Sequence, residues 1–195
     1  MNEALLVIDM QQGFINPASP FFVKGALDTV PYCRKAITTA RQHQIPVVWV
    51  KRIYRSDGTD VEKIRKDVWE EGGKPLTPGS DQRISDDFPP LLQPQKGERV
   101  LVKPRFSAFF ATPLDLYLRR MDIENLVLIG TMTPNCIRAT CFDGLSLDYS
   151  VTILENCCSS QTETIQKSNI EDMRRIGAKI LSLDTWVKSK AENRE

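Results

Sequence analysis

Residues 125–136 read NLVLIGTMTPNC, which is an apolar run followed at once by a turn and a cysteine. A short run of leucine and β-branched residues that is apolar on both faces predicts a buried strand of a parallel sheet. Cys136 then stands where the next helix is expected to begin. Unpaired backbone N–H groups and the positive end of the helix dipole favour a thiolate there, so the sequence predicts a nucleophilic cysteine directly after a strand.

Two other ionisable residues end apolar runs in the same way. Asp9 follows residues 4–8, ALLVI, and Lys103 ends residues 99–103, RVLVK. The carboxyl ends of the strands of an open parallel sheet line the crevice where ligands bind. We therefore expect Asp9, Lys103 and Cys136 to meet at one edge of a sheet.

Short apolar segments alternate with amphipathic segments along the whole chain. Strands are predicted at residues 4–8, 46–50, 99–103, 126–129, 151–154 and 179–182. Helices are predicted at residues 29–42, 61–70, 113–120, 136–147, 162–176 and 184–190, the first of them capped by Asp28. This repetition implies right-handed crossovers and a three-layer α/β/α sandwich around a six-stranded, mainly parallel, Rossmann-like sheet.

The chain of 195 residues is predicted to form one domain over residues 1–195. Residues 52–97 interrupt the alternating pattern with several Gly and Pro residues, so this segment is predicted to run as a long excursion across the strand ends. Long loops of this kind are usually functional. We expect the excursion to cover the active site or to contribute to a subunit interface.

The composition excludes several classes of partner. With 26 basic and 25 acidic side chains the net charge is +1, which supplies no field for capturing nucleic acid or an anionic membrane. No apolar run is long enough to cross a bilayer, and the first residues do not resemble a signal peptide, so we expect a cytoplasmic protein. An odd number of cysteines, five, predicts free thiols in a reducing environment.

The three strand-end residues together have the chemistry to hydrolyse an amide. The Lys103 ammonium and the helix dipole would hold the sulfur of Cys136 as a thiolate, while Asp9 would take the thiol proton and pass it to a leaving amine. Backbone N–H groups at the turn into the helix would bind the oxyanion. Taken singly, each residue also has a structural explanation, in core packing, loop capping or solvation. The combination favours catalysis.

The same motifs resemble those of the isochorismatase-like cysteine hydrolases. They are LLVIDMQQGF at residues 5–14, KPRFSAF at residues 103–109 with Thr112 and Leu114, and Gly130 with Thr133, Cys136 and Thr140. The resemblance extends from residue 4 to about residue 182. It implies that Asp9, Lys103 and Cys136 form a catalytic triad, with Cys136 as the nucleophile and Asp9 as the acid and base.

The resemblance also implies further features of the site and the assembly. The oxyanion donors would be the backbone N–H groups of Met132 and Cys136, beside a cis peptide bond at Met132-Thr133. Phe14, five residues after the aspartate, and Phe106, three after the lysine, are candidate substrate-binding residues, with core packing as the alternative for both. Members of the family have a six-stranded parallel sheet and are commonly oligomeric, so we expect a homodimer or a homotetramer.

Departures from the family pattern narrow the function. True isochorismatases typically lack the cysteine, so its presence favours the amidase branch. Metal-binding nicotinamidases carry an Asp-x-His arrangement after the second strand, where this chain has Arg52 and Tyr54, and its one histidine, His43, is expected near a helix end. We therefore expect no metal and no cofactor. Arg52 and Tyr54 become candidate substrate-binding residues, and Arg52 and Arg55 can clamp a carboxylate or a ureido carbonyl unless they are merely solvated.

These observations favour a metal-independent cysteine hydrolase that cleaves a C–N bond of a small amide or ureido substrate through a thioester intermediate. A nicotinamidase-like amidase and a catalytically silent small-molecule-binding member of the same fold are the alternatives. The intact set of three residues argues against the silent member. A dinucleotide-binding oxidoreductase is disfavoured, because the first strand is not followed by a Gly-x-Gly-x-x-Gly pattern.

Overall fold

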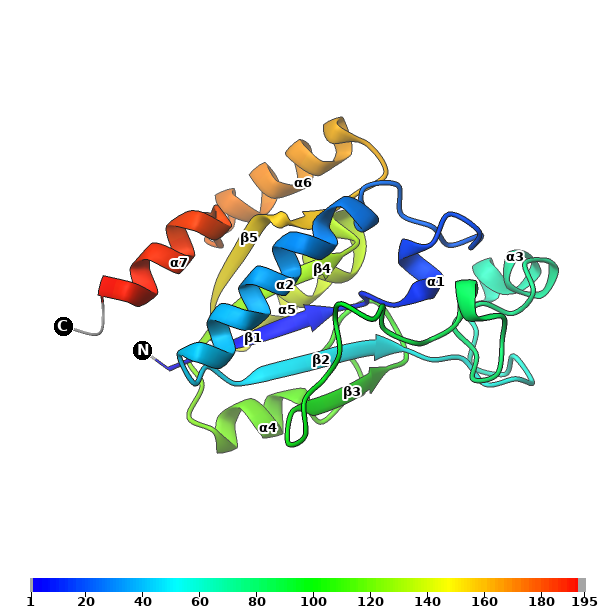
Figure 1. The fold of residues 1–195 in the computed structure, drawn as a ribbon, viewed down its shortest axis with the longest axis horizontal. Helices are drawn as coiled ribbons and strands as arrows, with labels where there is room; N and C mark the ends of the chain where they lie inside the picture. Colours follow the sequence, from blue (N-terminus) through cyan, green and yellow to red (C-terminus); the bar gives the residue numbers. More distant parts are fainter. Residues whose placement is uncertain (1, 193–195) are drawn as a thin grey trace.

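A parallel sheet of six strands forms the middle layer of the computed structural model, which describes residues 2–192 (Figure 1). The strands are β1 (Glu3–Ile8), β2 (Val47–Arg52), β3 (Arg99–Lys103), β4 (Asn125–Thr131), β5 (Ser150–Ser159) and β6 (Lys179–Leu181). Their order across the sheet is β3-β2-β1-β4-β5-β6, and each neighbouring pair is parallel. The direction of winding reverses between β1 and β4, which is where such sheets bind ligands.

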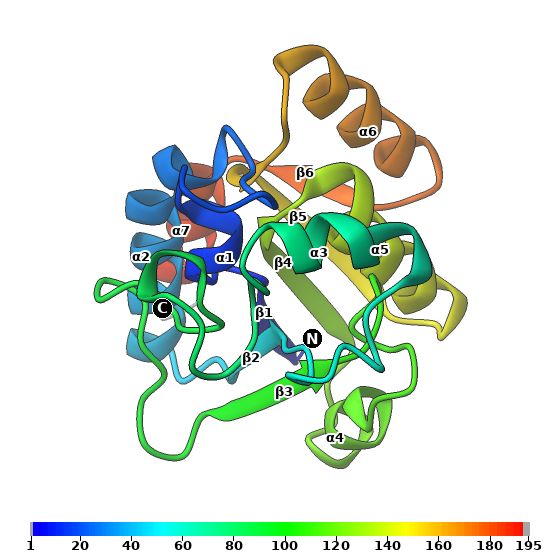
Figure 2. The same cartoon turned by 90° about the vertical axis from the view of Figure 1, so that its right-hand side faces the viewer.

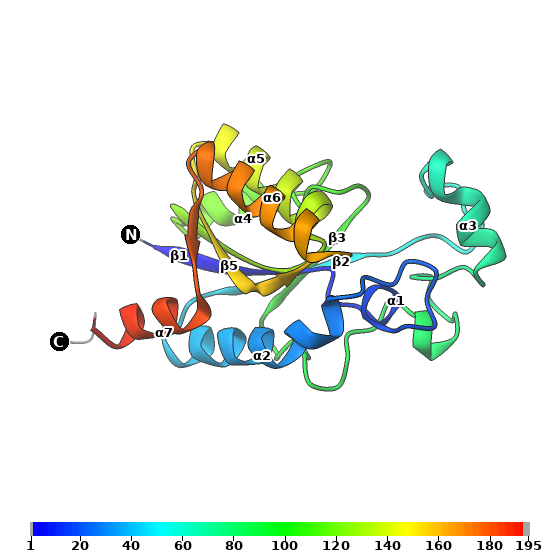
Figure 3. The same ribbon diagram turned by 90° about the horizontal axis from the view of Figure 1, so that it is seen from above.

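Helices cover both faces of the sheet. They are α2 (Ala26–Gln42), α4 (Leu114–Arg120), α5 (Arg138–Ser146), α6 (Glu163–Arg175) and α7 (Leu183–Glu192). Helices α2 and α7 lie on one face, and α4, α5 and α6 lie on the other (Figure 3). The predicted three-layer α/β/α sandwich is therefore confirmed. Within residues 2–192, no helix combines the length and the apolar character that a membrane span requires.

The central position of β1 in the sheet explains why its sequence is apolar throughout. Successive side chains of a strand point to opposite faces of the sheet. Leu5 and Val7 accordingly pack into the apolar cluster that contains residues of α2 and α7, whereas Leu6 and Ile8 pack into the cluster on the opposite face. Since all four are fully buried, a polar residue at any of these positions would face a helix layer.

Gly130 allows β4 to pass close to the end of β1. Its φ is +120°, and a Cβ atom at this position would lie 2.0 Å from the carbonyl oxygen of Ile8. Only glycine fits this conformation and this spacing. The register between β4 and β5 also shifts between Leu128 and Gly130. Irregularities of this kind redirect the chain at functional edges of sheets, and here the turn that carries Cys136 follows directly.

Helix α2 begins earlier than the sequence predicted. It starts at Ala26, and its N-cap is Gly25, so the prediction that Asp28 caps this helix is wrong. Asp28 instead lies in the first helical turn, where its negative charge interacts favourably with the helix dipole.

The excursion between β2 and β3 lies at the carboxyl end of the sheet. It contains η1 (Lys63–Arg65), α3 (Lys66–Glu71) and η2 (Gln82–Ile84). Helix α3, together with α1 (Gln12–Ile15), lies beyond the ends of the strands, in front of the sheet when it is viewed end on (Figure 2). The helix predicted over residues 61–70 therefore begins later, at Lys63, because Glu62 has φ −59° and ψ 134°, outside the helical region, and its carboxylate pairs with Arg52.

Candidate active site

Asp9, Lys103 and Cys136 meet at the carboxyl end of the sheet. The Nζ atom of Lys103 lies 2.7 Å from Oδ2 of Asp9 and 3.4 Å from Sγ of Cys136. Asp9 follows β1, Lys103 ends β3 and reaches past the end of β2, and Cys136 lies in the turn after β4. Lys103 therefore contacts both of the other side chains that the sequence placed at strand ends.

The backbone at Asp9 bends sharply as it leaves β1. Its φ is 53°, in the left-handed region that most residues with a side chain avoid, and its N–H group donates to the carbonyl of Val50 at 2.9 Å. Backbone conformations of this kind cluster at functional sites, where the surrounding structure enforces them. Here the bend leaves the Asp9 carboxylate at the end of the strand, beside Lys103.

The ion pair between Asp9 and Lys103 is buried. The exposed fractions of the two side chains are 1% and 0%. Transferring two ions from water costs several kcal/mol each, so a pair of apolar residues of similar volume would often stabilise the fold as well or better. A buried pair next to a cysteine in a cavity is therefore better explained by chemistry than by stability.

Cys136 lies in η3 (Thr133–Ile137), a π-helical turn that leads into α5, and it is almost completely buried. Burial raises the pKa of its thiol to about 11, and the negative charge of Asp9 raises the pKa further than Lys103 lowers it. The expectation that the helix dipole and Lys103 hold a resting thiolate is therefore wrong. A low-dielectric environment penalises the anion, so the resting thiol keeps its proton at neutral pH beside a carboxylate that can accept it.

The cis peptide bond of this turn is Thr131-Met132, one residue before the Met132-Thr133 bond that the family resemblance implied. The carbonyl of Met132 accepts hydrogen bonds from the N–H groups of Asn135 and Ile137, at 3.0 and 3.3 Å. The Met132 carbonyl therefore already belongs to the helical turn, and the cis bond lies directly before this turn. The N–H groups of Met132 and Cys136, the candidate oxyanion donors, lie in this turn.

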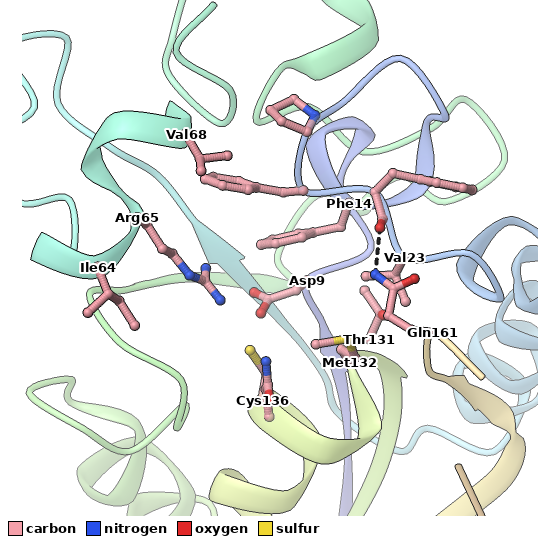
Figure 4. A pocket seen from close by; sticks show the side chains of 14 residues that line it. Asp9, Phe14, Val23, Ile64, Arg65, Val68, Thr131, Met132, Cys136 and Gln161 are labelled. Carbon is pink, nitrogen blue, oxygen red and sulfur yellow. Dashed lines mark hydrogen bonds between the residues drawn. The ribbon is translucent and has the colours of Figure 1, made fainter. Parts of the chain in front are cut away.

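Asp9 and Cys136 open onto a cavity of about 280 Å³ (Figure 4). Its walls come from α1, from the loop before α2, from the excursion and from the turn after β4, and most of the lining side chains are apolar. Ligand pockets range from about 300 to 1,000 Å³, so this cavity is close to the lower end of the range and has room for a small molecule only.

Phe14 lines this cavity, whereas Arg52 and Tyr54 do not. Both of the latter are about 1% exposed. Glu62 binds the two of them, with its Oε1 2.7 Å from an Arg52 Nη2 atom and its Oε2 accepting from the Tyr54 hydroxyl at 2.6 Å. Arg52 also donates to the carbonyl of Pro104. The expectation that Arg52 and Tyr54 contact substrate is corrected accordingly, because both side chains are buried outside the cavity lining and are held there by Glu62.

Phe106 and Arg55 are also outside the cavity lining. The Phe106 ring lies under two guanidinium groups, those of Arg52 and Arg65, at 5.9 and 5.1 Å from the ring centroid. Phe106 is therefore a support for the wall and not part of its surface. Arg55 is exposed and pairs with its neighbour Asp57 at 3.1 Å, which matches the alternative of a solvated loop arginine.

Tyr54→Phe is expected to lower the free energy of unfolding by about 1.5–3 kcal/mol, because it removes a buried hydrogen bond to a charged group. Since the Tyr54 hydroxyl is bound to Glu62, ligand binding in the cavity should stay within a few-fold of the wild type. Urea unfolding measures the first effect and calorimetric titration the second. Tyr32→Phe, at an exposed tyrosine, is the control and should leave stability unchanged. A stable Tyr54→Phe protein with impaired binding would restore Tyr54 to the binding site.

Four polar residues that line the cavity received no role from the sequence: Arg65, Thr131, Asn135 and Gln161. The side-chain amide of Gln161 donates to the carbonyl of Phe22 at 2.7 Å, which ties the loop before α2 to the end of β5 (Figure 4). Gln161 could have been found as a polar residue just after a strand end. It was missed because β5 extends five residues beyond the predicted strand. Arg65 lies in a basic segment that reads as a solvated surface.

The residues of the site do not fit a metal ion. Arg52 and Tyr54 stand where the metal-binding branch of the family is expected to carry ligands, and a guanidinium repels a cation. Residues 2–192 hold no group of three or more His, Cys, Asp or Glu side chains arranged to bind a metal. His43 caps the C-terminal end of α2.

Comparison of the sequence with known proteins identifies its family. The model of the isochorismatase domain matches residues 3–185. A protein of Arabidopsis thaliana named as a probable inactive nicotinamidase is 38% identical over 188 residues, which are 95% of this chain and 94% of that protein. The ureidoacrylate amidohydrolase RutB of Cronobacter sakazakii is 31% identical over 172 residues, 78% of this chain and 72% of RutB.

Solved structures agree with this result. The isochorismatase family protein of Desulfovibrio vulgaris superposes with a TM-score of 0.90 and 39% identity, covering 97% of this chain and 98% of that one. The N-carbamoylsarcosine amidase of Thermoplasma acidophilum has a TM-score of 0.78 and 29% identity, covering 94% and 98%. With the fold, the family model and these relatives in agreement, the chain belongs to the isochorismatase family, whose hydrolases include amidohydrolases.

Proposed function

We propose that this protein is a cysteine hydrolase that cleaves a C–N bond of a small amide or ureido substrate through a thioester intermediate, without a metal ion. The observation that carries the proposal is the contact of Asp9, Lys103 and Cys136 at the wall of a small, mostly apolar cavity. In this proposal Cys136 is the nucleophile, Asp9 is the general acid and base, and Lys103 offsets the negative charge that moves between them.

The first half of the reaction forms the thioester. Because the resting thiol is protonated, its proton passes to Asp9 as Sγ attacks the substrate carbonyl, and the carbonyl π electrons move onto oxygen. The N–H groups of Met132 and Cys136 bind this oxyanion, and losing one such donor typically costs about 3 kcal/mol of barrier. Asp9 then gives the proton to the leaving nitrogen, the C–N bond breaks, and ammonia or an amine leaves.

The second half of the reaction hydrolyses the thioester. A water molecule attacks the acyl carbon while Asp9 accepts one of its protons. The tetrahedral intermediate collapses with cleavage of the C–S bond, and the sulfur recovers its proton from Asp9. The products are a carboxylic or carbamic acid and the original thiol, so the protein returns to its starting state.

The names of two relatives support a ureido or amide substrate. RutB is named for ureidoacrylate and the Thermoplasma acidophilum protein for N-carbamoylsarcosine, and both compounds contain a carbonyl between two nitrogen atoms. The Arabidopsis relative, named as inactive, supports a second candidate, a silent protein that binds a small molecule without turning it over. The contact between Asp9, Lys103 and Cys136 favours the hydrolase, because a silent protein has no chemical need for a buried ion pair beside a thiol.

An ammonia-release screen separates the two candidates. The compounds are ureido acids, N-carbamoyl amino acids, biuret, nicotinamide and simple amides. Release from at least one of them, with a transient acyl adduct on Cys136 detected by mass spectrometry, is expected of the hydrolase. Compounds that bind without any release or adduct would favour the silent protein.

Iodoacetamide is expected to alkylate Cys136 before the other four cysteines, at a rate that rises about tenfold per pH unit between pH 7 and pH 9.5. The pKa of about 11 leaves a small thiolate fraction that grows with pH throughout this range. Cys136 lines the cavity, whereas Cys141, for example, is fully buried with a pKa raised by burial to about 12. Peptide mass spectrometry gives the order and the rates, and circular dichroism checks the fold. A rate independent of pH would reveal a preformed thiolate.

A further inference from the structure

Arg65 is the one cationic side chain that lines the cavity in the part of the chain that the structure describes. It ends η1 in the excursion, opposite the turn that carries Cys136, and its guanidinium points across the cavity toward Asp9 (Figure 4). The side chain is half-buried. An arginine therefore faces the site of the proposed reaction from the side that the excursion covers.

Two aromatic rings hold the guanidinium in place. Its central carbon lies 5.4 Å from the ring centroid of Phe21 and 5.1 Å from that of Phe106. Stacking on rings restrains the planar group while its N–H donors, which lie in the plane, stay available for a ligand. A restrained guanidinium loses less conformational entropy when it binds a planar anion.

The other charges around the cavity are neutralised in pairs. Lys103 is paired with Asp9, and Arg52 is paired with Glu62, whose second oxygen accepts the Tyr54 hydroxyl. Glu62 also attracts Arg65 electrostatically, but both of its carboxylate oxygens are already bound, to Arg52 and to Tyr54, and none of the ion pairs within residues 2–192 includes Arg65. The cavity is thus left with one uncompensated positive charge, in partly dry surroundings where charge attraction is stronger than in water.

We infer that the substrate carries a carboxylate and that Arg65 binds it. This inference names the substrate class of the proposed hydrolase and rests on that proposal. Arginine presents two parallel N–H donors that match the two oxygens of a carboxylate. With the scissile carbonyl at Cys136 and the carboxylate at Arg65, a cavity of about 280 Å³ leaves room for a short linker only. The class is therefore short-chain carboxylic acids that bear a ureido or carboxamide group.

The test measures binding to a Cys136→Ala protein, so that no turnover is needed. The probes are N-carbamoylglycine, 3-ureidopropionate and the uncharged carboxamide of each acid, titrated calorimetrically. At least one acid is expected to bind about tenfold to a hundredfold more tightly than its carboxamide, which is the range for hydrogen bonds to charged groups. Adding Arg65→Gln should remove this preference, and Arg65→Lys should keep only part of it, because the charge stays while the paired donors are lost.

Lys63→Gln is the matched control. Lys63 begins the same short helical turn, is exposed and does not line the cavity, so its removal changes the net charge equally without touching the ligand. The acid preference should survive in this variant. Equal affinity for acids and carboxamides, no binding of either acid, an acid preference that persists in Arg65→Gln, or an equal loss in Lys63→Gln would overturn the assignment.

The binding test and the ammonia screen fail independently of each other. If the acids bind through Arg65 while the wild type releases no ammonia from any compound, the proposed reaction is wrong and the Arg65 site stands. If ammonia is released from neutral amides without any preference for acids, the reaction stands and the carboxylate site is wrong.

Discussion

Cys136→Ala is expected to lower kcat/KM by at least about 10⁴-fold, because the thioester cannot form without the sulfur. The substrate is whichever compound the ammonia screen identifies. The substitution removes a single buried heavy atom, so we expect the free energy of unfolding to fall by only about 1 kcal/mol. Turnover and stability should therefore separate in this variant. Ammonia release measures the first, and urea unfolding measures the second.

Cys141→Ala is the control for this prediction. Cys141 is a buried free cysteine in α5, five residues further along the chain, and it does not line the cavity. The control should lose a similar amount of stability while its turnover stays within a few-fold of the wild type. If Cys136→Ala retained wild-type turnover, or if both variants lost activity equally, Cys136 would not be the nucleophile.

Lys103→Met is expected to destabilise the fold by about 3–5 kcal/mol and to abolish turnover. The substitution leaves the Asp9 carboxylate buried without its cation, and an unpaired buried charge is costly. The double variant Asp9→Asn with Lys103→Met removes both charges, so it should recover most of the lost stability. It should not recover activity, because no group is left to carry the proton. Urea midpoints and ammonia release report the two properties.

An exposed ion pair provides the comparison for Lys103. Lys35 pairs with Asp184 at 2.6 Å, with side chains that are 53% and 72% exposed. Pairs of this kind contribute about 0–1 kcal/mol, so Lys35→Met should change stability very little. A double variant at Asp9 and Lys103 as unstable as Lys103→Met alone would mean that lost packing, and not the unpaired charge, causes the destabilisation. Turnover by the double variant would exclude the pair from catalysis.

The sequence predicted the contact of the three strand-end residues because strand ends are local features. A short apolar run bounded by a polar residue marks where a buried strand stops, and parallel strands stop at the same edge of the sheet. Asp9 directly follows β1, Lys103 ends β3, and Cys136 lies in the turn after β4. No pairing between distant residues had to be known to bring them to one edge.

The excursion could not be predicted in the same way. Arg52 was a candidate substrate ligand, but Glu62 from the next turn of the chain folds back and binds it. Arg65, three residues further on, faces the cavity instead. The packing of an irregular segment over the sheet decides which arginine pairs with a carboxylate of the protein and which one faces the cavity. No periodic sequence pattern encodes that packing.

By itself, the sequence determined the layers of this protein, the six strands and the meeting of an acid, a base and a thiol, because each follows from local patterns of apolar and polar residues. Only the tertiary structure decided the protonation state of Cys136 and which arginine lines the cavity. The thiol of Cys136 is protonated at rest because segments distant in the chain bury it, and electrostatic free energy depends on that burial more than on the helix end where the residue lies.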